Sequence, residues 1–161
     1  MKVVEKILII AALISIPLSI YMINEYVTTY RKIMNTEIKA IILNATFQNE
    51  ELKMELKISI IAQGTPFIAH KIQYTLYLNG KYMLIEKLTE PIQLIPGKEV
   101  IIQRKLTMPK ERMFTVWEAV EEGKWMWRVS GTLFTRTYLG ETLIRFRSSM
   151  NFPPKNTPLK D

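Results

Sequence analysis

The chain has 161 residues and no cysteine, with 22 basic against 15 acidic residues and a formal net charge of +7. The lack of cysteine excludes a disulfide framework and a thiolate metal site. The basic residues are dispersed, which argues against a nucleic-acid partner and favours a mixed, solvated surface, with attraction to membranes or polyanions as a secondary effect.

The N-terminal segment Ile7–Ile23 contains no charged residue. As a helix it spans about 25 Å, and apolar residues extend it at both ends, as is typical of a helix that crosses a bilayer. Lys2 and Lys6 precede it, as in a secretory signal, but no small-x-small cleavage site follows it. A pilin-type leader is also disfavoured, because no Lys-Gly or Arg-Gly precedes the apolar run. We therefore predict an uncleaved signal-anchor over residues 1–27.

The orientation of this anchor rests on a small difference in charge. Lys2 and Lys6 lie on one side and Arg31 and Lys32 on the other, so counting positive residues barely separates the two orientations. The short N-terminal tail and the large C-terminal domain favour a single-pass protein of the cell membrane whose domain is extracytoplasmic. Residues 24–35 keep apolar side chains at helical spacing, which predicts that the helix continues into a short stalk over residues 28–36.

A domain of about 115 residues, over 37–150, is expected to follow. It begins with two strands, Glu37–Phe47 and Glu51–Ala62, joined by a polar turn at 48–50. The second strand has apolar residues at every other position, which predicts one buried face and one solvated face. The residues expected to be buried there are Leu52, Met54, Leu56, Ile58 and Ile60.

The stretch Pro66–Pro109 reads as three further strand-like runs separated by two turns. Asn79-Gly80 suits the type I′ turn of a hairpin, and Pro96-Gly97 suits a type II turn before the strand Glu99–Met108. Alternation in the first run predicts that one face is buried and the other solvated. The expected buried face comprises Ile72, Tyr74, Leu76 and Leu78.

After this stretch the periodicity changes to that of a helix. Pro109 is suited to the first turn of a helix, and Gly123 is suited to its C-terminal end. The buried stripe is predicted to comprise Met113, Val116, Trp117 and Val120.

Two more strands, Trp125–Tyr138 and Glu141–Ser149, are predicted around a turn at Leu139-Gly140. A disordered, proline-rich tail over 151–161 is expected to follow. The pattern thus predicts a mainly β protein: an antiparallel β-sandwich of about seven strands with one helix, preceded by a single N-terminal transmembrane helix.

The run YTLYLNGKYM…EPIQLIPGKEVIIQRKLTMP and the later WRVSGTLFTRTYLGETLIRFR resemble the water-stress and hypersensitive-response (WHy) domain. This domain characterises a folded group of late-embryogenesis-abundant proteins, here in a membrane-anchored form of archaeal type. The resemblance covers roughly residues 40–148, but the asparagine-proline pair of the family is reduced to Pro66 alone. The positions that match the family pattern are Tyr74, Leu76, Asn79, Gly80, Pro91, Ile92, Pro96, Gly97, Val129 and Gly131.

Signals for catalysis are weak throughout the chain. His70 is the single histidine, and it is interpreted as a solvated or packing residue with no obvious partner. The adjacent Glu121 and Glu122 would point in different directions on a helix, so they do not form a carboxylate pair. Phosphate-binding glycine motifs are absent from the sequence. We therefore expect no enzymatic activity, no cofactor, no metal and no small-molecule substrate.

Three further features have a structural and a functional interpretation. Trp117, Trp125 and Trp127 could stack on a base or a sugar, but core and helix-docking roles are favoured. Asn44 begins an N-x-[ST] sequon and is a candidate glycosylation site, although a sequon within a strand favours coincidence. The remaining feature consists of Arg136, Arg145 and Arg147, which could form a basic stripe that binds lipid headgroups or a cell-wall polyanion. Solvated positions on strand faces are the favoured interpretation of these arginines.

The resemblance implies a non-catalytic, membrane-anchored module with a stress-protective or envelope-stabilising role. The alternative is a structural accessory of a cell-surface machine or envelope layer, which binds protein partners through its β-sandwich. The expected partners are the lipid bilayer and, under the alternative, a protein of the envelope. An exposed apolar patch or an unprotected edge strand would favour the alternative.

Overall fold

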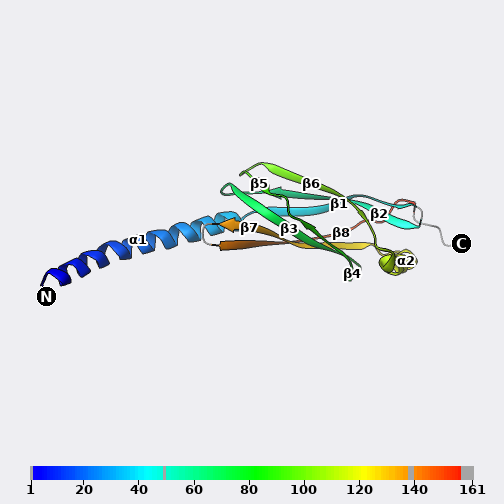
Figure 1. The fold of residues 1–161 in the computed structure, drawn as a ribbon. Helices are drawn as coiled ribbons and strands as arrows, with labels where there is room; N and C mark the ends of the chain where they lie inside the picture. Colours follow the sequence, from blue (N-terminus) through cyan, green and yellow to red (C-terminus); the bar gives the residue numbers. More distant parts are fainter. Residues whose placement is uncertain (1, 49, 138–139, 157–161) are drawn as a thin grey trace.

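The computed structural model describes residues 2–48, 50–137 and 140–156. A long helix, α1 (Lys2–Met34), extends from one end of a β-sandwich, and a short helix, α2 (Met113–Glu122), lies at the other end (Figure 1). The predicted mainly β fold with its N-terminal apolar helix is confirmed. The strands are β1 (Glu37–Gln48), β2 (Glu51–Ile61), β3 (Phe67–Leu78), β4 (Lys81–Leu88), β5 (Ile92–Leu94), β6 (Glu99–Thr107), β7 (Met126–Thr137) and β8 (Gly140–Asn151).

The strands form two antiparallel sheets that pack face to face. The smaller sheet has the order β1-β2-β6, and the larger has the order β4-β3-β7-β8, with β5 also paired to β3. Strand β5 is the difference from the seven strands expected. It comprises three residues, which pair with Phe67–Ala69 at the start of β3. A run of three residues is too short to show a periodicity in the sequence. Its place in the sheet comes from its pairing with β3.

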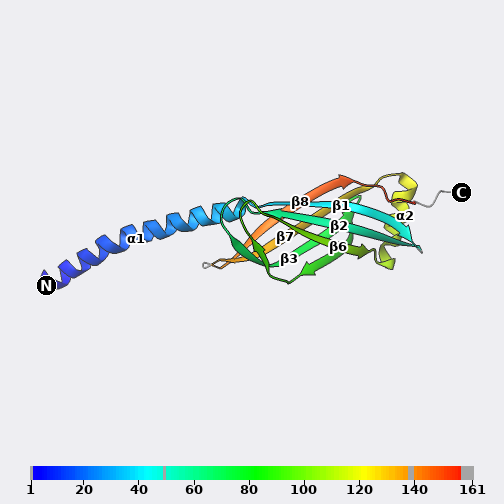
Figure 2. The same cartoon turned by 90° about the horizontal axis from the view of Figure 1, so that it is seen from above.

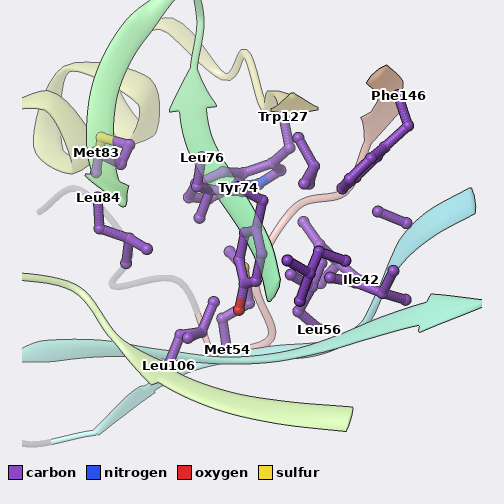
Figure 3. Close-up of a cluster of buried hydrophobic side chains, with 14 of the residues drawn as sticks. Ile42, Met54, Leu56, Tyr74, Leu76, Met83, Leu84, Leu106, Trp127 and Phe146 are labelled. Carbon is purple, nitrogen blue, oxygen red and sulfur yellow. The ribbon is translucent and has the colours of Figure 1, made fainter. Parts of the chain in front are cut away.

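The core lies between the two sheets and consists of the alternating inward positions (Figure 3). In β2, Leu52, Leu56, Ile58 and Ile60 are fully buried and Met54 nearly so, as predicted. In β3 the predicted face is also confirmed, and each of its four members has no exposed surface: Ile72, Tyr74, Leu76 and Leu78. Period-2 alternation therefore located the core in both strands.

The two long edges of the sandwich differ. On one edge β1 lies beside β8, and the Ala40 N–H donates a hydrogen bond to Ser148 Oγ at 3.0 Å. On the opposite edge β4 and β6 are not paired, and Arg104 Nη2 lies 3.9 Å from Glu86 Oε2 across the gap. The sandwich is thus nearly closed on the β1–β8 edge and open on the β4–β6 edge.

The predicted turn chemistry is confirmed where the structure describes it. Asn79 and Gly80 both have positive φ angles, of 49° and 85°, as a type I′ turn requires. Gly97 has φ 75°, and the Lys98 N–H donates to the Ile95 carbonyl at 3.0 Å, as expected for a type II turn. The predicted turns at 48–50 and at Leu139-Gly140 include residues 49 and 139, which lie outside the described residues.

The start of the C-terminal tail is ordered against the sandwich. The predicted disorder began at residue 151, whereas β8 extends to Asn151 and Phe152 packs against the core. The Lys155 N–H donates to the Ala45 carbonyl at 2.7 Å, next to the parallel bridge between Lys155 and Thr46. Backbone hydrogen bonds to the end of β1 thus hold a segment that has no sequence pattern. Residues 157–161 lie outside the described residues.

Candidate functional site

The junction between α1 and the sandwich joins the two parts without a flexible linker. Ile33, in the last turn of α1, is only 2% exposed because it packs into the core of the domain. The Thr36 hydroxyl donates to the Ile33 carbonyl at 2.7 Å and ends the helix immediately before β1. The helix therefore leaves the domain close to the long axis of the sandwich (Figures 1 and 2).

Gly64 brings the loop between β2 and β3 against the backbone of α1. A Cβ atom built at Gly64 would lie 2.5 Å from the Lys32 Cβ and 2.8 Å from both the Cα and the carbonyl oxygen of Lys32. Two of these three atoms are backbone, so they cannot move aside as the end of a side chain would. The loop can approach the helix only because residue 64 has no side chain.

Replacing Gly64 with valine is expected to loosen this junction. The added atoms must displace the helix or the loop, and such overpacking typically costs about 1–3 kcal/mol of unfolding free energy. The measurement is chemical denaturation of the full-length protein, combined with spin-label distances between residue 28 on α1 and residue 57 on β2. The matched control is Thr65→Val in the same loop. Unchanged stability and an unchanged distance distribution for Gly64→Val would contradict the packed junction.

A hollow of about 400 Å³ lies at this junction, between the last turns of α1 and the sandwich. Arg136 lines it, and so it lies apart from Arg145 and Arg147, which line a separate hollow on the face of the larger sheet. The three arginines therefore do not form one stripe. Other residues that line the junction hollow are Thr29, Ile33, Pro66, Phe67 and Gln93.

His70 has a partner, in contrast to the sequence interpretation. Its Nε2 lies 2.9 Å from Glu141 Oε1, and its ring meets the ring of Phe134 edge to face. Glu141 is 71 positions away in sequence, and pairing of both β3 and β8 with β7 brings the two together. His70 and Glu141 are both substantially exposed. Within the described ranges, no group of three or more histidine, aspartate or glutamate residues could hold a metal ion.

The positions that match the WHy pattern have structural roles in the fold. The Asn79 amide donates to the Lys124 carbonyl at 2.9 Å and its oxygen accepts from the Met126 N–H at 3.0 Å, which ties the β3–β4 turn to the start of β7. Tyr74, Leu76 and Val129 are fully buried. Pro91 precedes β5, Ile92 begins it, and Pro96 and Gly97 form the turn that follows it.

Gly131 is the matching position with the tightest surroundings. A Cβ atom there would lie 2.5 Å from the Phe146 Cζ and 2.7 Å from the Gln73 carbonyl oxygen. The ring of Phe146 therefore lies where a side chain of residue 131 would be. This close packing gives a physical reason for glycine after Val129 in the pattern.

Tyr74 places a buried phenol near the open edge of the sandwich (Figure 3). Its pKa is raised from 10.0 to about 12, chiefly by burial and then by the Glu86 carboxylate, while Arg104 partly offsets these two effects. The folded state therefore holds the phenol proton of Tyr74 more tightly than the unfolded state does. The resulting contribution to the unfolding free energy is fully present below pH 10 and is lost as the pH rises toward 12.

The alkaline stability of the Tyr74→Phe variant tests this assignment. We expect the unfolding free energy of the wild type to fall more steeply between pH 10 and 12 than that of the variant, because the other tyrosines contribute equally to both. The measurement is urea denaturation at a series of pH values. Parallel pH profiles for the two proteins would show that Tyr74 does not contribute.

The three tryptophans separate into two environments. Trp125 and Trp127 are 5% and 0% exposed, so their predicted core role is confirmed. Trp117 is 37% exposed and stacks on Phe47, with ring centroids 5.6 Å apart, so its placement on the buried stripe is wrong. The small Ala119 takes that place and is fully buried with Val116. The helix is therefore rotated slightly from the predicted orientation.

Asn44 lies in β1 at an irregularity of the strand, opposite Glu55. Its side chain is half-buried and lines a shallow hollow of about 250 Å³ with Lys53 and Lys105. Its use as a glycosylation site stays a prediction.

Comparison with known proteins finds solved structures with a similar fold but identifies no family. No family model matches the chain, and no curated protein matches its sequence. A crystal structure of a protein from Archaeoglobus fulgidus is 14% identical, with a TM-score of 0.52, over 75% of this chain and 98% of that one. A solution structure of a protein from Arabidopsis thaliana is 15% identical, with a TM-score of 0.56, over 76% of this chain and 81% of that one.

A solution structure of a candidate late embryogenesis abundant protein is also similar. It is 9% identical, with a TM-score of 0.48, over 74% of this chain and 73% of that one. Identities this low relate the folds alone. The two structures with TM-scores above 0.5 show a shared fold, and membership of the WHy family stays a prediction.

Proposed function

We propose that the chain is a non-catalytic module, held in a membrane by α1, with a stress-protective or envelope-stabilising role. The observation that carries the proposal is the exposure of α1. Its large apolar side chains from Val3 to Ile23 are 56–71% exposed, and the domain buries none of the 18-residue apolar window within the candidate span Lys6–Met34. An isolated apolar helix of this length is stable where lipid covers it. The motif resemblance supports the protective role.

The anchor holds the domain at a defined orientation. Ile33 and Gly64 fix α1 to the sandwich, so the long axis of the domain stands away from the membrane rather than lying on it. With the domain outside the cell, the sandwich stands above the bilayer on the extended end of α1. This arrangement suits a component that spaces or braces an envelope.

A second function, as an accessory that binds a protein partner, is favoured by exposed apolar groups at the far end. Phe114 on α2 is 71% exposed, and Met126 at the start of β7 is 51% exposed. Strand β6 is also an open edge, where Ile101 is 49% exposed. Exposed aromatic groups and unpaired edges are common features of protein interfaces.

Purification of the tagged, full-length protein from detergent-solubilised membranes separates the two functions. The protective module is expected to purify without a stoichiometric partner, and proteoliposomes that contain it should retain an enclosed dye better after drying than empty liposomes. A single stoichiometric protein partner that is lost in Phe114→Ser would instead establish the accessory function. Failure of both the dye assay and the partner search would contradict the proposal.

A further inference from the structure

Five cations on the outer face of the larger sheet have no carboxylate partner in the part of the chain that the structure describes, whereas Glu141 at the end of that face pairs with His70. Lys71, Arg128, Arg145 and Arg147 lie at outward positions, because they alternate with buried residues along β3, β7 and β8. Lys87 joins them from β4, opposite Gln73. Among the described residues, no carboxylate lies within ion-pair distance of these five. We refer to these five residues as the cationic face.

The centre of the cationic face is a shallow hollow of about 490 Å³, whose floor combines hydroxyl and amide side chains with Gly131 and Phe146. The strand register aligns the floor with two guanidinium groups on β8. Three hydroxyl side chains and one amide on β3 and β7 line the hollow together with the two arginines. The two rows across β3, β7 and β8 are Gln73, Thr132, Arg145 and Thr75, Ser130, Arg147.

The outer face of the smaller sheet provides an internal comparison, because charges of both signs alternate there. Lys39 lies 3.5 Å from Glu37, and Lys57 lies 3.7 Å from Glu99. Lys105 pairs with Glu55 in the register of β2 and β6. The excess positive charge is therefore concentrated on one face of the domain rather than spread over both. A field of one sign on one face attracts anions.

The chemistry of the cationic face identifies an occupant. The two aromatic rings at its ends are already covered, because Lys71 lies over Phe134 at 3.8 Å and Arg128 lies over Tyr77 at 4.5 Å. These rings cannot serve as stacking platforms for nucleic-acid bases. The hydroxyl and amide floor instead matches a polymer rich in hydroxyl groups, and the guanidinium groups match carboxylates.

We propose that the cationic face binds a carboxylate-bearing polysaccharide, with Arg145 and Arg147 holding the acid groups above the floor. The face is shallow and crosses several strands, which suits an extended chain rather than an enclosed small ligand. The headgroups of the membrane that holds α1 are too far from the cationic face to be its ligand. This distance follows from the membrane anchor proposed above. The α1 segment Ile23–Thr29 adds about 9 Å of height, and the stretch from Gly140 to Arg145 adds about 16 Å, because the end of β7 lies beside Thr29. Arg145 therefore lies well beyond a Debye length of about 8 Å from the end of the apolar segment.

The test is a binding titration of full-length protein in nanodiscs of zwitterionic phosphatidylcholine. Fluorescently labelled polygalacturonate is expected to bind and uncharged dextran is not. The double variant Arg145→Ala/Arg147→Ala should weaken binding by roughly tenfold or more, because each guanidinium is a charge-assisted donor. Arg145→Lys/Arg147→Lys should fall between the two, since lysine keeps the charge and loses the bidentate geometry. Thr132→Val, which removes one floor hydroxyl, should weaken binding about threefold.

The matched control is Lys53→Ala/Lys105→Ala, which removes the same charge from the outer face of the smaller sheet. It should leave polygalacturonate affinity within about twofold of wild type. If the arginine-to-alanine and the lysine-to-alanine double variants weakened polygalacturonate binding equally, net charge alone would explain the effect, and the proposed site would be overturned. Tighter binding of a single-stranded oligothymidine, of polyglutamate or of anionic lipid vesicles than of polygalacturonate would also overturn it. Absence of polygalacturonate binding would overturn the polysaccharide site and leave the membrane anchor, which is tested separately by membrane extraction, unaffected.

Discussion

Replacing Trp127 with alanine is expected to lower the free energy of unfolding by about 3–5 kcal/mol. Trp127 is the largest fully buried side chain of the domain. Its Nε1–H donates to the Phe152 carbonyl at 3.0 Å, so it also holds the chain that leaves β8. The variant therefore loses core contacts and leaves the part-buried Phe152 carbonyl without its donor. Urea denaturation of the full-length protein in detergent, followed by far-ultraviolet circular dichroism, measures the loss.

Two further variants divide this effect into its parts. Trp127→Phe keeps most of the apolar volume and removes the N–H donor, so it should cost about 1–2 kcal/mol. Trp117→Ala removes a residue of the same type that is 37% exposed, and it should cost about 1 kcal/mol, chiefly the stacking on Phe47. Equal losses for Trp117→Ala and Trp127→Ala would mean that burial does not distinguish the two sites.

The sequence predicted the features that depend on neighbouring residues. Alternation located the buried faces of β2 and β3, because a half-buried strand repeats every second residue. The turns at Asn79-Gly80 and at Gly97 followed from residues that accept positive φ angles. Pro17 lies inside α1 without ending the helix.

The remaining features depend on residues that are distant in sequence. Glu141 reaches His70 only through two strand pairings, and no local signal indicates that register. The separation of Arg136 from Arg145 and Arg147 likewise follows from pairing and from the docking of α1. Trp117 was misplaced because a small rotation of the helix keeps Met113 and Val116 buried while Ala119 replaces Trp117, and Ala119 is too small to be a strong signal.

Insertion of α1 into a membrane would fix the compartment in which the whole domain lies. The helix is continuous from Lys2 to Met34 and carries its apolar groups around its full circumference between Val3 and Ile23. A helix that is apolar on all sides is buried in protein or in lipid, and the described residues of this chain do not cover it. The wild-type protein should therefore remain in the membrane pellet after high-salt and alkaline washing, which removes proteins held by surface charge.

Replacing Leu13 and Ile14 with two arginines is expected to release the protein from the membrane or to abolish its accumulation. Each arginine at the centre of a spanning helix adds about 2.5–3.5 kcal/mol to the free energy of insertion, so the pair outweighs the few tenths contributed by each apolar residue. The control is Asn24→Arg/Thr28→Arg, which adds the same charge to exposed positions beyond the apolar segment and should leave the protein in the pellet. Protease added to intact cells should digest the sandwich and spare α1. Pellet association of Leu13→Arg/Ile14→Arg after alkaline washing would contradict a spanning α1, and a protease-resistant domain in intact cells would place the sandwich in the cytoplasm.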